Sequence, residues 1–125
     1  MGVDFSGFTI YGAELDEDCW FVTEMDYGED IDKPYTIKYE QDHYSGHSKM
    51  LVISDELVNK YNLDIIYDHY AGQWQILGIN YLNEDPDQTI QNLTGIKEKW
   101  NNLLSELDLP IQKYQPYLMC DCYAW

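Results

Sequence analysis

Arginine is missing from this sequence, and its seven basic residues, all lysines, stand against 23 aspartates and glutamates. The formal net charge is −16 at pH 7. Such a charge repels nucleic acids and anionic membrane surfaces. Phosphate recognition is further disfavoured, since neither GxxxxGK nor GxGxxG occurs and no arginine can clamp a phosphate. We therefore expect neither direct nucleic-acid binding nor a nucleotide-dependent enzyme.

Cysteine is scarce, and long apolar runs are absent. The three cysteines, Cys19, Cys120 and Cys122, predict reduced thiols in the cytoplasm rather than a disulfide scaffold. Cys120 and Cys122 fall on one face of an expected strand, which favours buried core thiols; zinc ligation with Cys19 as a third ligand is the alternative. No segment reaches the roughly 18 apolar residues of a transmembrane helix, and residues 1–20 lack a secretory signal pattern. We expect a cytoplasmic protein with no membrane partner.

Apolar and aromatic residues, by contrast, are plentiful. Hydrophobic residues make up 45% of the chain and aromatic residues 15%, including twelve tyrosines and four tryptophans. This composition supplies enough apolar surface for a folded core despite the high charge. The length lies within the usual range for one domain. We expect a single acidic α+β domain over residues 1–125.

Alternating runs of β-branched and aromatic residues predict three hairpins. The first joins 8–15 to 19–23, the second joins 35–39 to 50–53, and the third joins 65–67 to 74–81. A final apolar run at 117–125 predicts a closing strand. Because hairpin-length connections dominate, the sheet is expected to be mostly antiparallel, with about five to seven strands.

Two helices are expected. Ser54 is a suitable N-cap and Asn62 a suitable end for a short helix at about 54–61. Apolar residues recur every three or four positions from Ile90 to Leu107, which predicts one long amphipathic helix, about 87–107, packed on a sheet face. Gly95 weakens that helix by about 1 kcal/mol relative to alanine. The fold class is therefore α+β, with an exposed acidic loop expected at 26–34.

Histidines fit metal-binding and catalytic motifs poorly. His43 and His47 are four positions apart, but Gly46 lies between them and indicates a loop rather than a helix. His69 has no evident partner in the sequence. We expect ordinary surface histidines, no catalytic residue and no bound metal or cofactor.

Two acidic runs, Asp26–Asp32 and Asn83–Asp87, resemble parts of calcium-binding loops. The second run lacks the central glycine and the final glutamate that an EF-hand requires. For Asp85 and Asp87 we favour a different role, as negative charge at the N-terminus of a helix.

Acidic residues concentrate near the N-terminus, where the first 32 residues hold ten carboxylates and no basic residue. Side chains on one face of a strand are about 6.7 Å apart, whereas phosphates along one DNA strand are about 3.4 Å apart. Mimicry of nucleic acid therefore needs carboxylates from two or more segments, and 14–18, 24–32 and 40–42 supply them. The predicted partner-binding residues are Glu14, Asp16, Glu17, Asp18, Trp20, Glu24, Asp26, Tyr27, Glu29, Asp30 and Asp32.

These features predict a non-enzymatic acidic inhibitor that occludes the basic nucleic-acid-binding cleft of a nuclease or defence effector. In charge and size the chain resembles small phage-encoded anti-defence proteins, such as anti-CRISPR or anti-restriction inhibitors, and bacterial immunity proteins that neutralise nuclease toxins. That resemblance implies a DNA or RNA mimic and transfers no residue roles.

Three alternatives remain. The acidic residues can form a solvated face that only keeps the protein soluble. A viral or mobile-element scaffolding module would bind through its aromatic surface and could form homo-oligomers. A metal-dependent hydrolase would be built on Asp, His and Cys residues.

Overall fold

The computed structural model describes residues 5–15, 19–40, 48–67 and 75–124. In these residues the chain adopts the predicted α+β fold, and its seven strands agree with the predicted five to seven. The strands form two sheets rather than one, and four helices are present rather than the two predicted. The elements in chain order are β1 (Phe5–Leu15), β2 (Trp20–Thr23), α1 (Glu24–Tyr27), β3 (Tyr35–Lys38), β4 (Met50–Ile53), α2 (Asp55–Tyr61), β5 (Leu63–Tyr67), β6 (Gln75–Asn80), α3 (Pro86–Leu93), α4 (Ile96–Glu106) and β7 (Tyr117–Ala124).

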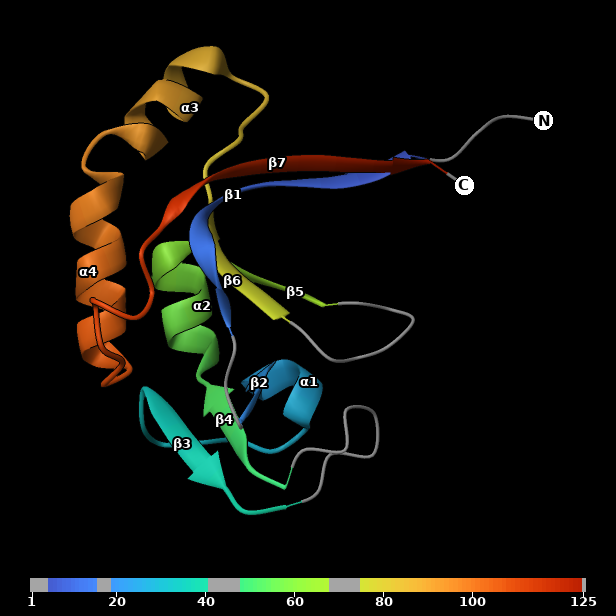
Figure 1. The fold of residues 1–125 in the computed structure, drawn as a ribbon, viewed down its shortest axis with the longest axis vertical. Coiled ribbons are helices and arrows are strands. Elements are labelled where there is room, and N and C mark those ends of the chain that lie inside the picture. Colours follow the sequence, from blue (N-terminus) through green and yellow to red (C-terminus); the bar gives the residue numbers. More distant parts are fainter. Residues whose placement is uncertain (1–4, 16–18, 41–47, 68–74, 125) are drawn as a thin grey trace.

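The larger sheet has four antiparallel strands in the order β5-β6-β1-β7. Strand β1 changes partners along its length, because Phe5–Gly12 pairs with β7 and Ile10–Leu15 pairs with β6. At the change-over Gly12 is opposite Gly78, and a Cβ built on Gly12 would lie 2.0 Å from the carbonyl oxygen of Leu77. Only glycine permits this approach of two backbones. The predicted third hairpin and closing strand are confirmed here as β5–β6 and β7 (Figure 1).

The smaller sheet has the order β2-β4-β3, with β3 antiparallel and β2 parallel to β4. The β3–β4 pair confirms the second predicted hairpin. The first predicted hairpin is wrong, because β2 leaves β1 and joins β4 instead. All four residues of β4 are buried, so both faces of this central strand are covered.

The predicted long helix is divided into α3 and α4 at Gly95, whose φ of 70° is left-handed. The 3.6-residue periodicity continues across this break, so the sequence pattern did not reveal it. Figure 1 shows α4 running beside the sheet and α3 extending past its end. Ile90 in α3 is accordingly 63% exposed, whereas Trp100 in α4 is fully buried.

Both sheets contribute to one hydrophobic cluster, which α2 and α4 cover. It includes Leu77 from the larger sheet, Ile53 from the smaller one, Leu57 of α2 and Trp100 of α4. The short predicted helix is confirmed as α2, since Ser54 accepts a hydrogen bond from the Leu57 amide at 3.2 Å and Asn62 ends the helix in the left-handed conformation. This shared core fixes the smaller sheet, and with it the acidic segment that follows β2.

Candidate partner-binding surface

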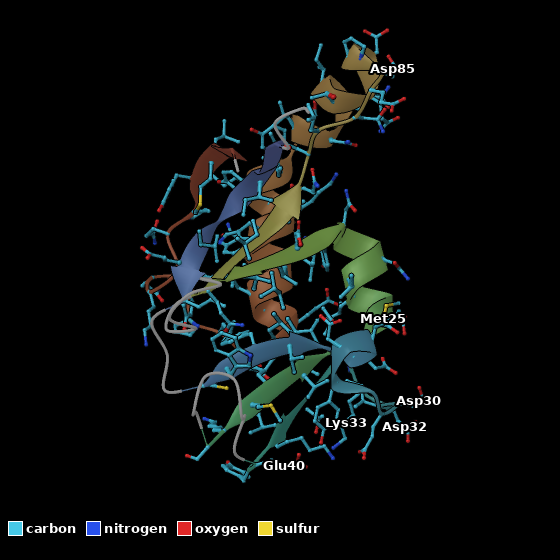
Figure 2. The ribbon with its side chains drawn as sticks, turned by 90° about the vertical axis from the view of Figure 1, so that its right-hand side faces the viewer. Met25, Asp30, Asp32, Lys33, Glu40 and Asp85 are labelled. Carbon is cyan, nitrogen blue, oxygen red and sulfur yellow. The ribbon has the colours of Figure 1, made fainter. Side chains whose placement is uncertain are left out.

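Four of the predicted partner-binding acids, Asp26, Glu29, Asp30 and Asp32, lie on α1 and the loop after it, and we call them the acidic face. All four side chains are exposed, and their carboxylates make no hydrogen bond or ion pair in the structure as described. Figure 2 shows Asp30 and Asp32 pointing outward at one edge of the molecule. No lysine forms an ion pair with these carboxylates in the described residues, although Lys33 directly follows Asp32 in the sequence.

Helix α1 has its own local signals. Thr23 is the N-cap, and its side-chain oxygen accepts a hydrogen bond from the Asp26 amide at 3.2 Å. Gly28, with φ of 89°, ends the helix. The prediction of a loop over residues 26–34 is therefore wrong for residues 26 and 27, which lie in α1. The spacing Thr23-x-x-Asp26 before Gly28 was the available signal, but four residues are too few for apolar periodicity.

Glu24 has a structural role, unlike the acidic face. Its two carboxylate oxygens accept hydrogen bonds from the amides of Ile31, at 3.2 Å, and Asp55, at 3.0 Å. In return the Asp55 carboxylate accepts a hydrogen bond from the Met25 amide at 3.3 Å. The N-termini of α1 and α2 thus exchange capping carboxylates, and Glu24 also holds the acidic loop at Ile31.

Tyr27 donates a hydrogen bond from its hydroxyl to a carboxylate oxygen of Glu40 at 2.8 Å. This hydrogen bond, with a smaller contribution from burial and from the charges of Glu40 and Glu29, raises the pKa of Tyr27 to about 12. The contact joins α1 to the end of β3, so the ring of Tyr27 is oriented beside the acidic face.

The remaining predicted partner-binding residues lie elsewhere. Glu14 is exposed on β1, in the other sheet, and Trp20 on β2 is 7% exposed. Asp16, Glu17 and Asp18 fall outside the described residues, as does Asp42. The analysis of the sequence overlooked Met25, which is 78% exposed on α1 and labelled in Figure 2. An exposed methionine beside carboxylates offers an adaptable apolar contact to a partner.

A cavity of about 240 Å³ lies next to α1, at the outer edge of β2. Its lining consists of Trp20, Phe21, Val22, Thr23, Asp26, Ile65 and Gln75. The Gln75 side chain is buried and pairs with the backbone of Phe21: its amide nitrogen donates to the carbonyl oxygen at 2.6 Å, and its oxygen accepts from the amide at 2.8 Å. Gln75 therefore acts as one more strand residue beside β2 and ties the two sheets together.

The second acidic run, Asn83–Asp87, provides hydrogen-bond acceptors at the N-terminus of α3. Asp85 is the N-cap, and its carboxylate accepts a hydrogen bond from the Asp87 amide at 3.0 Å, while Asn83 accepts one from the Asp85 amide at 2.9 Å. The predicted helix N-terminal role of Asp85 and Asp87 is confirmed. Over the described ranges, no group of three or more His, Cys, Asp or Glu residues is arranged to hold a metal ion.

The structure describes Cys19 with its side chain and describes Cys120 and Cys122 by their backbone. Cys19 is buried in the core cluster. The backbone of β7 places Cys120 opposite Thr9 and Cys122 opposite Gly7. His43, His47 and His69 lie outside the described residues, so the structure does not bear on their predicted surface role.

Comparison with known proteins returned no similar family model, no matching curated protein and no matching solved structure. Within the described ranges, no helix combines the length and apolar character needed to cross a membrane. The acidic face and the adjacent cavity are therefore interpreted from their own chemistry.

Proposed function

We propose that this protein is a non-enzymatic inhibitor that places its acidic face in the basic nucleic-acid-binding cleft of a partner protein. The observation that supports the proposal is the set of four exposed carboxylates of the acidic face, none of which forms an ion pair within the described residues. Lysine and arginine side chains that bind phosphates can bind such carboxylates in their place.

Preorganisation of the acidic loop supports the same function. The loop begins at Gly28 and is tied at Ile31 by the Glu24 carboxylate, so the acidic side chains project from a backbone with defined contacts. Ordering a loop before binding reduces the entropy lost in the complex. Met25, exposed beside these acids, adds an apolar contact that a purely solvating surface would not need.

The partner that fits this surface is a basic protein that handles nucleic acid, such as a nuclease or a defence effector. Two settings are consistent with it: anti-defence proteins of phages, including anti-CRISPR and anti-restriction inhibitors, and immunity proteins against nuclease toxins. Both settings place the inhibitor in the host cytoplasm. In both, opposite charge speeds association by about 10-fold to 1000-fold at low salt.

The test combines capture and inhibition. Tagged protein is incubated with host lysate, washed at low and high salt, and the captured proteins are assayed for nuclease activity with and without added inhibitor. We expect a basic nucleic-acid enzyme that is lost at high salt and inhibited at low salt. The triple variant Asp26→Lys, Asp30→Lys, Asp32→Lys should abolish both capture and inhibition.

A matched control separates local from overall charge. The triple variant Glu84→Lys, Asp87→Lys, Glu98→Lys makes the same change in net charge around α3 and α4, away from the acidic face. It should retain most of the inhibition. Equal loss in both triple variants, or salt-insensitive capture, would contradict the proposal.

A scaffolding role is the second candidate, because β7 is the terminal strand of the larger sheet as described, and Tyr117 and Leu118 on it are both more than half exposed. Exposed sheet edges pair readily with a further strand. Sedimentation analysis that finds a stable homo-oligomer, lost on Leu118→Lys but kept in the triple variant of the acidic face, would favour this candidate.

A further inference from the structure

Two predicted partner-binding residues, Trp20 and Asp26, border the cavity beside β2. Trp20 comes from β2 and Asp26 from α1, and both line the same space of about 240 Å³. Trp20 is 7% exposed, so only a small part of its surface can border this cavity.

The lining has a definite chemistry. Apolar walls come from Trp20, Val22 and Ile65, while Thr23 and Gln75 contribute neutral polar groups. Asp26 is the lining residue with an ionisable carboxylate, and this group makes no hydrogen bond or ion pair in the structure as described. An anionic ligand would be repelled by Asp26 and by the rest of the acidic face, whereas a cation would be attracted.

We propose that this cavity receives a cationic side chain, lysine or arginine, from the partner protein. The inference rests on the proposed function and specifies a contact within it. A lysine or arginine side chain has an aliphatic stem and a charged head, so the stem can lie against Val22 and Ile65 while the head reaches Asp26.

The frame of the cavity is held in place before any ligand binds. The two hydrogen bonds between Gln75 and Phe21 fix the edge of β2, and the hydrogen bond from the Asp26 amide to Thr23 fixes the start of α1. Binding at such a site requires little rearrangement of the protein. The cavity also adjoins the acidic face directly, since Asp26 belongs to both.

The experiment is a nuclear magnetic resonance titration of the isotope-labelled full chain with N-acetylarginine N-methylamide. We expect saturable shifts of the Trp20 indole and Gln75 side-chain amide signals. N-acetylleucine N-methylamide, a neutral apolar probe, should leave these signals in place. Shifts that do not saturate, or equal shifts with the leucine probe, would overturn the proposal.

Two variants with the same charge change locate the effect. Asp26→Asn keeps the backbone hydrogen bond to Thr23 and should weaken binding of the arginine probe by about threefold, the range of an exposed ion pair. Asp30→Asn, in the same acidic face but outside the cavity lining, should leave it unchanged. Equal weakening in both variants would assign the binding to the general field of the protein and overturn the cavity site.

A cavity-filling variant and a free amine complete the test. Val22→Phe adds apolar volume without changing the charge and should abolish the saturable shifts. Putrescine, a free diamine, should bind no more tightly than the capped arginine. Much tighter binding of putrescine would identify a site for small amines and overturn the assignment to a partner side chain.

The outcome is separable from that of the proposed function. Binding of the arginine probe together with an unchanged complex in the double variant Asp30→Lys, Asp32→Lys, which leaves Asp26 in place, would retain the cavity site and reject the nucleic-acid mimic. Inhibition that depends on the acidic face, without any binding of the probe, would do the reverse.

Discussion

Two acidic segments of similar composition, Asn83–Asp87 and Asp26–Asp32, have opposite relations to the fold. In the first, Asn83 and Asp85 accept backbone hydrogen bonds and begin α3. In the second, the carboxylates of the acidic face accept no such bonds within the described residues. The two segments lie at opposite ends of the molecule (Figure 2). Acidic composition alone therefore does not distinguish a capping segment from a surface available to a partner.

The position of each segment relative to its helix explains the difference. Asn83–Asp87 precedes and enters α3, where the unpaired amides of the first turn need acceptors. Most of Asp26–Asp32 follows α1, near carbonyl oxygens that carry partial negative charge. Carboxylates there gain nothing from the helix and repel one another. Because these carboxylates do not stabilise the fold where they lie, a role in binding is the proposal to test.

The largest expected effect concerns Glu24, an acid next to the acidic face whose carboxylate accepts two backbone hydrogen bonds. Glu24→Ala removes acceptors from the amides of Ile31 and Asp55, and we expect a loss of about 2 kcal/mol in the free energy of unfolding. Urea unfolding followed by circular dichroism measures it. Glu29→Ala is the control, because it removes an exposed carboxylate without such bonds and should change stability by less than about 0.5 kcal/mol. Equal effects would remove the distinction between structural and unpaired acids.

The next effect concerns the N-cap of α3. Asp85→Ala removes the acceptor for the Asp87 amide, so we expect a loss of about 1 kcal/mol. Asp85→Ser restores a capping oxygen without the charge and should recover most of that loss. The same urea titration measures both variants. If the serine variant were as unstable as the alanine variant, charge rather than hydrogen bonding would explain the role of Asp85.

Local signals account for the parts of the fold that could be predicted. Ser54 and Asn62 set the ends of α2, because caps depend on neighbouring residues. The antiparallel pairs β3–β4 and β5–β6 each join strands that are consecutive in the sequence. The parallel pairing of β2 with β4 could not be predicted in this way. It depends on the burial of β4 on both faces, which follows from the packing of elements far apart in the sequence.

In the candidate site, too, features that depend on residues far apart in the sequence could not be predicted. Exposure of Asp30 and Asp32 followed from composition, since acidic loops are rarely buried. The cavity could not be predicted, because it depends on the contact between Phe21 and Gln75, which are 54 positions apart. The exposure of Met25 could not be predicted either, because it depends on α1, and a helix of four residues is too short to show a periodic pattern in the sequence.

A smaller effect of opposite sign is expected within the acidic face. The double variant Asp30→Asn, Asp32→Asn reduces repulsion among exposed carboxylates and should stabilise the protein by a few tenths of a kcal/mol at low salt. Added salt should raise the melting temperature of the wild type and reduce the gap between the two proteins, since exposed charges are screened. Differential scanning calorimetry at about 20 mM and about 300 mM salt, where the Debye length is about twice and about half its value at 0.1 M, measures both. A double variant less stable than the wild type would indicate structural bonds made by these acids.

The smallest effect concerns Tyr27, where an exposed hydrogen bond joins α1 to Glu40. The folded state favours the protonated phenol, so its contribution to stability is present below the ordinary tyrosine pKa of 10 and is lost as pH rises toward about 12. Carbon NMR of ring-labelled tyrosine should find Tyr27 still protonated at a pH where unperturbed tyrosines are half ionised. Glu40→Ala removes both the hydrogen-bond acceptor and the charge that raise the pKa of Tyr27, and it should move this pKa back toward 10, with little change in stability because the pair is exposed. An unchanged pKa in that variant would mean that Glu40 does not hold Tyr27, and that the ring beside the acidic face is oriented by other contacts.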